Sequence, residues 1–222
     1  MSSNYLIIIP EITKGMKSIG SKSLLKINSQ LTILDYQIKS IKKINRRNKI
    51  FLSTGFQHNK INKTIERYRN VTTIYEKNFS AYNETKHIIN YIKHVNRFDD
   101  LFIVNSGIIF RNDCFKNIKK NESKIFFLDK TKDNFNIGCG DKDTDYLFYD
   151  FPILWSECIF LKDNDLEKIF QLNQKNNLDH YFLFETINKI YSHINIQKIT
   201  IPSKDIMKIN GISDIPKARR FI

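Results

Sequence analysis

Lysines and glycines alternate in one short segment near the amino end of the chain, and this composition suits the binding of phosphate. Lys14, Lys17 and Lys22 supply ammonium groups, and Gly15 and Gly20 lie between them. An ammonium group donates charge-assisted hydrogen bonds to phosphate oxygens. Glycine lets the backbone come close to a ligand and adopt positive φ. The segment therefore predicts a nucleotide site in which a cationic loop binds the phosphates of the ligand.

The neighbouring elements place this loop at the edge of a sheet. The apolar run 5–9 predicts a buried strand that ends at Pro10, and the periodic pattern over 32–44 predicts a helix. A strand that opens into a flexible, cationic loop and then a helix is a common arrangement for binding phosphate. We expect the lysines to lie where that strand ends.

Short apolar runs alternate with helical segments through the first half of the chain. This alternation predicts parallel strands joined by crossover helices. The predicted strands are 6–9, 50–53, 72–75, 101–104 and 125–128, and the predicted helices are 31–44, 58–68 and 82–95. The expected fold is α/β, a Rossmann-like three-layer sandwich with a mixed, mainly parallel sheet.

The second half of the chain predicts an extension of that sheet and a short closing helix. Apolar-aromatic runs over 146–151 and 153–161 indicate mixed or antiparallel strands, and 194–201 indicates a last strand. Helices are predicted over 163–172 and 178–193. Asp214 is a candidate N-cap for a final helix that reaches Phe221 and has Pro216 in its first turn.

The overall composition bounds the protein class. The chain has 222 residues, 41% of them hydrophobic, so we expect a single domain over residues 1–222 with a proper core. Its 36 basic and 23 acidic residues leave a net charge of +13, which favours anionic partners. Three unclustered cysteines fit a reducing compartment. No apolar run approaches the length of a membrane span, so we expect a soluble, cytoplasmic protein.

Four segments resemble, in chain order, the sugar-phosphate and choline-phosphate nucleotidyltransferases. These segments are 7–27, 49–56, 78–85 and 206–218. The first carries Leu24-Leu25-Lys26-Ile27, similar to the family's Pro-Lys-x-Leu-Leu block, and the second ends in a Thr-Gly-Phe turn. The resemblance spans nearly the whole chain and implies the family's glycosyltransferase-A-like Rossmann fold.

The resemblance also implies which residues form the site. Lys22 falls on the family's Pro-Lys lysine and Lys17 on its loop arginine, so these two are the candidate catalytic residues. The implied nucleotide-binding residues, which include Lys22 again, lie in the loop, before the third helix and after the fourth strand: Pro10, Thr13, Lys14, Gly15, Lys22, Asn78, Asn83, Asn105 and Ser106.

The chain departs from the family at the positions that bind metal. The family's Asn-Gly-Asp-Val falls on Asn105-Ser106-Gly107-Ile108, so Gly107 stands at a metal-binding aspartate and Asn210 at the second ligand position. Glycine has no side-chain ligand, and a neutral amide is a weaker Mg²⁺ ligand than a carboxylate. The resemblance implies Mg²⁺ as cofactor, but these residues give it little support.

Other carboxylates could take over the metal, although each has a plainer interpretation. Asp99 and Asp100 precede the fourth strand, where a solvated turn is expected. Asp141, Asp143 and Asp145 follow the fifth strand, where a solvated hairpin tip is expected. The latter also contain the Asp-x-Asp string of glycosyltransferases, but later in the chain than such enzymes place it.

The resemblance implies transfer of a nucleotidyl group, CTP or UTP being the favoured donor, to a sugar phosphate or other phosphorylated alcohol. Pyrophosphate is released, and the product would serve surface-glycan or polysaccharide synthesis. Two alternatives remain open: a catalytically degenerate protein that binds a nucleotide or nucleotide sugar, and a glycosyltransferase on the same fold. The chain has basic runs but no helix-turn-helix, RNP motif or zinc finger, which disfavours nucleic acid.

Overall fold

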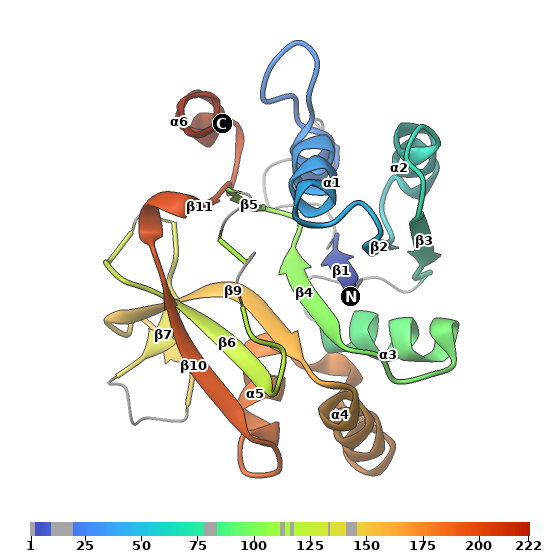
Figure 1. Cartoon of the computed structure of the whole chain (residues 1–222), viewed down its shortest axis with the longest axis vertical. Coiled ribbons are helices and arrows are strands. Elements are labelled where there is room, and N and C mark those ends of the chain that lie inside the picture. Colours follow the sequence, from blue (N-terminus) through green and yellow to red (C-terminus); the bar gives the residue numbers. More distant parts are fainter. Residues whose placement is uncertain are drawn as a thin grey trace.

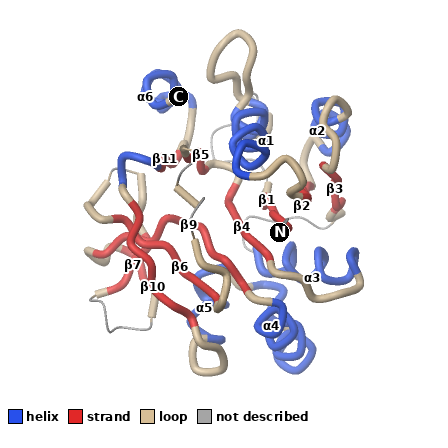
Figure 2. Tube along the Cα trace, viewed as in Figure 1, coloured by secondary structure: helices blue, strands red, loops and turns tan. Residues whose placement is uncertain are grey.

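A mixed sheet forms the middle layer of the molecule, with helices on both faces (Figures 1 and 2). The computed structural model describes residues 3–9, 20–77, 84–111, 114–115, 118–132, 134–140 and 146–222. The strands run in the order β10-β6-β9-β4-β1-β2-β3 across the sheet. The bounds are β1 Asn4–Ile8, β2 Lys49–Thr54, β3 Val71–Tyr75, β4 Leu101–Asn105, β6 Ser123–Leu128, β9 Ile153–Leu161 and β10 Ile196–Ile201. The predicted α/β fold with a mixed, mainly parallel sheet is confirmed.

The two halves of the sheet differ in strand direction. Strand β1 pairs in parallel with β2 on one side and β4 on the other, and β3 continues this half in parallel. Strand β9 runs antiparallel between β4 and β6, and β10 then pairs in parallel with β6. The parallel half therefore brings the carboxyl ends of β1 and β4 to one edge, which is where α/β folds bind ligands.

Successive side chains of β1 point to opposite faces of the sheet, and those on both faces are apolar. Helices therefore pack against both faces. Leu6 and Ile8 of β1 pack into a core with helices α3, α4 and α5. Tyr5 and Ile7 pack into a second core with α1 and α2. Figure 1 shows these two sets of helices on opposite sides of the sheet. The helices are α1 Ile33–Ile44, α2 His58–Ile65, α3 Glu84–Val95, α4 Asp163–Asn176, α5 Leu183–Ile190 and α6 Ile215–Phe221.

A side-chain cap marks the beginning of α1, whereas the residue before α6 bonds elsewhere. The Thr32 hydroxyl accepts a hydrogen bond from the Asp35 N–H, and the Asp35 carboxylate accepts one from the Thr32 N–H, which forms a capping box at the start of α1. Asp214 directly precedes α6, as predicted, and proline stands in the first turn. The Asp214 carboxylate makes no capping hydrogen bond to α6. It accepts the N–H groups of Asn210 and Gly211 and so fixes the chain before the helix.

The predicted helix over 178–193 is wrong, because the chain is extended in its middle. A short 3₁₀ helix covers Leu178–His180, and α5 begins only at Leu183. The N–H of Leu183 donates to the Glu84 carboxylate at 3.0 Å, and the N–H of Phe182 donates to Glu185 at 2.8 Å. These side-chain acceptors replace the helical carbonyls at the break, so a continuous helix is not needed to satisfy the backbone.

Smaller elements complete the fold, and among the strands described next only Phe148–Tyr149 lies within a run, 146–151, that predicted a strand. Strands β5 (Ile108–Phe110) and β11 (Ile206–Lys208) form an antiparallel pair outside the main sheet. Strands β7 (Ile137–Cys139) and β8 (Phe148–Tyr149) extend the sheet beside β9. Helix α2 ends three residues before its predicted limit of 68, and α4 continues four residues beyond 172. Within the described ranges, no helix combines the length and apolar character that crossing a membrane requires.

Candidate functional site

A cavity of about 280 Å³ lies at the carboxyl ends of β1 and β4. Its floor is formed by Ile8 at the end of β1 and Asn105 at the end of β4. The β9 strand and the β11 strand close the opposite side. The polar and charged residues around it are Lys22, Glu84, Asn105, Asn136, Glu157, Lys208 and Asn210, and Trp155, Tyr149, Phe182 and Phe184 add an aromatic wall.

Lys22 enters the cavity from a short 3₁₀ helix, Lys22–Leu24, whose approach depends on glycine. Gly20 has φ of +95°, and a Cβ there would lie 2.6 Å from the side-chain amide of Gln57. That amide accepts the N–H of Ser21 at 3.0 Å, which anchors the chain directly before Lys22. The expected role of a glycine with positive φ therefore holds at Gly20, where no other residue fits without strain.

The turn between β4 and β5 is fastened to α1 by a buried glutamine. The Gln37 side-chain amide donates to the carbonyls of Asn105 at 3.0 Å and Ile108 at 2.7 Å. The N–H of Ser106 donates to the Ile8 carbonyl at 2.9 Å, which ties the same turn to β1. Because Gln37 is fully buried, these bonds hold Asn105 and Gly107 at the cavity in one geometry.

The Lys22 ammonium group lies directly against Gly107. A Cβ on Gly107 would come 2.7 Å from Lys22 Nζ and 2.8 Å from the carbonyl oxygen of Ile209. Burial lowers the pKa of the Lys22 ammonium, and the nearby carboxylate of Glu157 opposes that shift. The missing side chain at position 107 is thus what admits the end of Lys22.

Glu84, the first residue of α3, places a carboxyl group at the cavity. Its two oxygens accept hydrogen bonds from the Asn105 side-chain amide at 3.2 Å and from the Leu183 N–H at 3.0 Å. Burial raises the pKa of this carboxyl to about 7, and the negative charge of Glu157 adds to the shift. Glu84 is therefore a group that changes charge near neutral pH.

Glu157 and Lys208 form an ion pair at the wall of the cavity. Glu157 is 8% exposed, lies within strand β9, and has φ of +59°. A residue other than glycine in the left-handed region is strained, and such strain persists where the surrounding structure enforces it. The register of β6 against β9 also shifts at this point. This irregularity turns the Glu157 carboxylate towards the Lys208 ammonium group.

Sequence reasoning missed Glu84, Glu157 and Lys208. One signal was available: Glu157 is the only charged residue in the run 153–161, which is otherwise apolar or small and polar. A lone carboxylate in a buried strand needs a partner. Glu84 and Lys208 lie within segments that resemble the family, 78–85 and 206–218, but nothing in their spacing assigned them to the site.

The predicted site residues divide into those the structure describes and those it does not. Lys22, Asn105, Gly107 and Asn210 lie around the same cavity, and Ser106 is buried in the turn beside it. Their roles stay predictions. The remaining predicted residues lie outside the described residues: Pro10, Thr13, Lys14, Gly15, Lys17, Asn78 and Asn83.

The alternative metal donors that the structure describes lie far from this cavity. Asp99 and Asp100 precede β4, whereas the cavity lies beyond its other end at Asn105. A strand rises about 3.3 Å per residue, so roughly 16 Å separates Asp100 from Asn105. Asp141, Asp143 and Asp145 lie outside the described residues.

The described residues around the cavity do not fit the protein-bound Mg²⁺ that the family resemblance implies. Position 107 carries no side chain, and Asn210 offers only a neutral amide. The Glu84 oxygens accept two hydrogen bonds, and Glu157 is paired with Lys208. Among the described residues no group of three or more histidine, cysteine, aspartate or glutamate side chains could hold a metal ion.

Comparison with solved structures shows the same fold over the full chain. CTP:phosphocholine cytidylyltransferase from Streptococcus pneumoniae superposes with a TM-score of 0.77 at 15% identity and covers 99% of each chain. The inositol-1-phosphate CTP transferase from T. maritima gives 0.79 at 8% identity, over 99% of this chain and 94% of that one. The chain has the nucleotidyltransferase fold.

A third neighbour extends this likeness to sugar nucleotides. The nucleoside-diphosphate-sugar pyrophosphorylase from Vibrio cholerae RC9 has a TM-score of 0.76 at 8% identity, over 98% of this chain and 99% of that one. No protein-family model matches the sequence, and neither does any curated protein. The nucleotidyltransferase fold is therefore evident from comparison of the structures and not from these comparisons of sequence.

Proposed function

We propose that this protein transfers a nucleotidyl group from CTP or UTP to a phosphorylated acceptor. The single observation that carries the proposal is the Lys22 ammonium group, which faces a cavity at the carboxyl ends of β1 and β4 in a nucleotidyltransferase fold. In the reaction an acceptor phosphate oxygen attacks the α-phosphorus. The bond from the α-phosphorus to the bridging oxygen of the β-phosphate breaks, and pyrophosphate leaves.

The described residues suit this chemistry because the reaction needs positioning and charge neutralisation more than covalent help. Lys22 and Lys208 bring two ammonium groups to one cavity. The Gln37 hydrogen bonds hold the turn beside Lys22 in a fixed place. Donors that are fixed before the substrate binds need not reorganise when negative charge grows on the α-phosphate oxygens.

The aromatic wall supports an acceptor with an apolar or cationic surface. Trp155 and Phe184 are nearly fully buried beside the cavity. The rings of Tyr149 and Phe184 pack edge to face, with their centroids 5.3 Å apart. Aromatic faces receive the CH face of a sugar ring or a quaternary ammonium group, and the nearby carboxylates of Glu84 and Glu157 add hydrogen-bond acceptors. A sugar phosphate or another phosphorylated alcohol such as phosphocholine is the acceptor that we propose, in cytoplasmic surface-glycan or polysaccharide synthesis.

A second candidate function follows from Gly107. A chain that lacks the family's aspartate at this position could bind a nucleotide or nucleotide sugar without turning it over. Binding and pyrophosphate release are separate measurements, so the two functions can be told apart. A glycosyltransferase would instead respond to finished nucleotide sugars and release a nucleoside diphosphate.

The test has a binding stage and a turnover stage on the purified chain. Thermal shift with CTP, UTP, GTP, ATP and nucleotide sugars, with and without Mg²⁺, identifies the donor. Pyrophosphate release is then measured with that donor and phosphocholine, sugar 1-phosphates or inositol phosphate. We expect a shift with CTP or UTP and acceptor-dependent pyrophosphate release.

Lys22→Ala is the variant that connects the result to this cavity. Loss of one charge-assisted contact to phosphate weakens binding by about 10- to 100-fold. An unchanged nucleotide affinity in this variant would contradict the proposed site. Binding without any pyrophosphate release, over all acceptors, would favour the degenerate binding protein over the enzyme.

A further inference from the structure

We infer that the Lys22 ammonium group takes the place of a protein-bound divalent cation, so that this site binds nucleotide phosphates without metal coordination by the protein. The inference rests on the proposed nucleotide site and adds its means of charge neutralisation. It concerns only a metal ion with ligands from the protein. Its main support is the close approach of the Lys22 ammonium group to Gly107.

The first argument is steric. The space that a side chain on residue 107 would enter is filled, because its Cβ would lie 2.7 Å from Lys22 Nζ and 3.0 Å from Lys22 Cε. Protein Cβ atoms are in ordinary contact only beyond about 3.4 Å, so a carboxylate at this position would displace the end of Lys22. With Lys22 placed as it is in this chain, its ammonium group and an aspartate side chain at position 107 exclude each other.

The second argument is electrostatic. An aspartate with a bound Mg²⁺ carries a single net positive charge, and so does one ammonium group. Burial lowers the pKa of the Lys22 ammonium group, and the carboxylates of Glu157, Glu84 and Asp214 lie close enough to oppose that shift. A site with glycine at position 107 and Lys22 beside it thus offers phosphate the same net charge as an aspartate–magnesium pair.

The third argument is that the carboxylates near Lys22 in the described part of the chain already have partners. Asp214 accepts the N–H groups of Asn210 and Gly211 and the side-chain amide of Asn134. Glu157 pairs with Lys208, and Glu84 accepts from Asn105 and Leu183. Recruiting any of them to a metal would break hydrogen bonds that hold the cavity together, at a cost for each buried group left unpaired.

A double-mutant cycle tests whether Lys22 fills the space at position 107, and it needs no nucleotide. Gly107→Ala places a Cβ against both Lys22 and the Ile209 carbonyl, and we expect Tm to fall by about 5 °C. In a Lys22→Ala background the same change meets only the carbonyl, so we expect about half of that loss. Additive losses would overturn the inference.

Calorimetry of the unaltered protein with CTP tests the consequence for metal. We expect the CTP affinity in EDTA to equal or exceed that in Mg²⁺, within about threefold. A loss of about tenfold or more in EDTA would overturn the inference. If neither CTP nor UTP binds under either condition, the proposed function fails. The inference, which rests on it, then fails as well, whereas binding that weakens about tenfold in EDTA overturns the inference and leaves the proposed function standing.

Discussion

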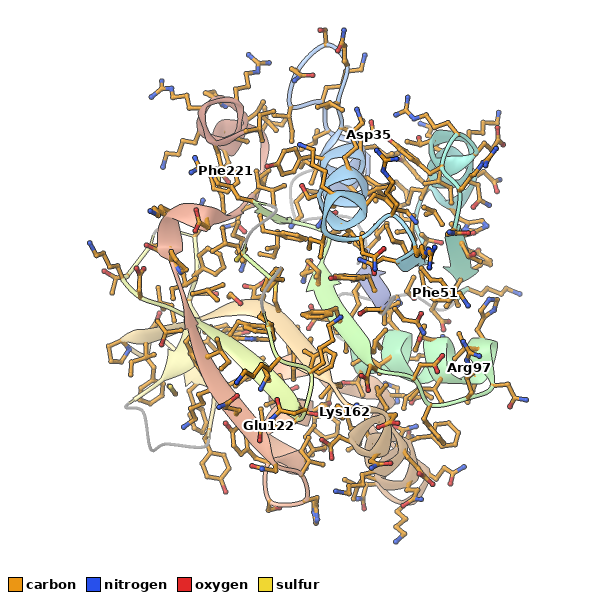
Figure 3. All side chains as sticks on the ribbon, in the orientation of Figure 1. Asp35, Phe51, Arg97, Glu122, Lys162 and Phe221 are labelled. Carbon is orange, nitrogen blue, oxygen red and sulfur yellow. The ribbon has the colours of Figure 1, made fainter. Side chains whose placement is uncertain are left out.

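The two ends of strand β4 carry the same kinds of charged side chains but arrange them differently. At the amino end Asp99 pairs with Arg97 at 2.5 Å, and Asp100 pairs with Lys162 at 2.6 Å. Figure 3 labels Arg97 and Lys162 at this edge, beside α3 and α4. At the carboxyl end Lys22 lies against the backbone of Gly107 inside a cavity. The charged side chains at the amino end pair with one another around a second pocket, whereas at the carboxyl end the Lys22 ammonium group lies against backbone at the cavity.

The two ends also differ in how deeply their charged side chains are buried. The amino-end side chains are a quarter to more than half exposed, and water screens their attraction. The Glu157–Lys208 pair at the carboxyl end is only 10% and 16% exposed on its two side chains, so its interactions are stronger. The edge at which parallel strands end, together with burial, distinguishes the candidate site from a solvated surface cluster.

Removing one lysine from each end gives the largest contrast. We expect Lys22→Ala to weaken CTP binding by about 10- to 100-fold, because a fixed ammonium group beside the phosphates is lost. Lys162→Ala, the matched control, removes the same charge from the amino end and should leave the affinity within about twofold. Calorimetry of both variants makes the comparison. Equal losses would mean that net charge, and not position, governs binding.

Breaking one ion pair at each end gives the next largest contrast. Glu157→Gln leaves the Lys208 ammonium with only a neutral partner in a buried place, and we expect a loss of about 1–2 kcal/mol of unfolding free energy. Asp100→Asn breaks an exposed pair and should cost less than about 1 kcal/mol. Urea unfolding measures both. A larger loss for Asp100→Asn would reverse the ranking of the two ends.

The smallest expected effect is a pH dependence that belongs to the carboxyl end. Glu84 has a pKa raised to about 7 by burial, with Glu157 adding to the shift and Lys208 and Lys22 opposing it. Between about pH 4.5 and 7 the folded chain therefore keeps the Glu84 carboxyl protonated, whereas the unfolded chain does not. The stability that this proton contributes at low pH is lost as pH rises through that window. Above pH 7 the carboxylate repels phosphate.

The Glu84→Gln variant isolates this effect from the titration of the nucleotide itself. At pH 6 the protonated glutamate resembles glutamine, so we expect similar CTP affinities for the two proteins. At pH 8 the unaltered protein should bind CTP about threefold to fivefold more weakly than the variant. Calorimetry at the two pH values supplies the ratio. A constant ratio would show that Glu84 does not titrate in this range.

Much of the fold follows from local patterns, because its main strands and helices carry their own periodicity. The run 153–161 predicts β9 at its observed bounds, and the Thr32–Asp35 capping box marks the start of α1. The β5–β11 pair has no such signal. Its two three-residue strands join segments about a hundred positions apart, and only tertiary pairing makes them strands.

The candidate site was predictable only where a resemblance pointed to it. Lys22, Asn105, Gly107 and Asn210 were named from matching segments, and they lie around one cavity. Glu157 could not be placed in this way, since its direction depends on a left-handed residue inside a strand. The break before α5 was equally hidden, because the acceptor that replaces a helical carbonyl belongs to Glu84, on a distant helix.

The place of β9 between β4 and β6 has a consequence for how the chain folds during synthesis. Strand β6 precedes β9 in the chain but cannot join the sheet until β9 has been made to lie beside β4. Lys208, the last residue of β11, and Asn210, two residues after it, are made later still. A nascent chain on the ribosome therefore exposes an unfinished sheet edge and has no complete cavity until residue 210 has emerged, so early ligand capture cannot assist its folding.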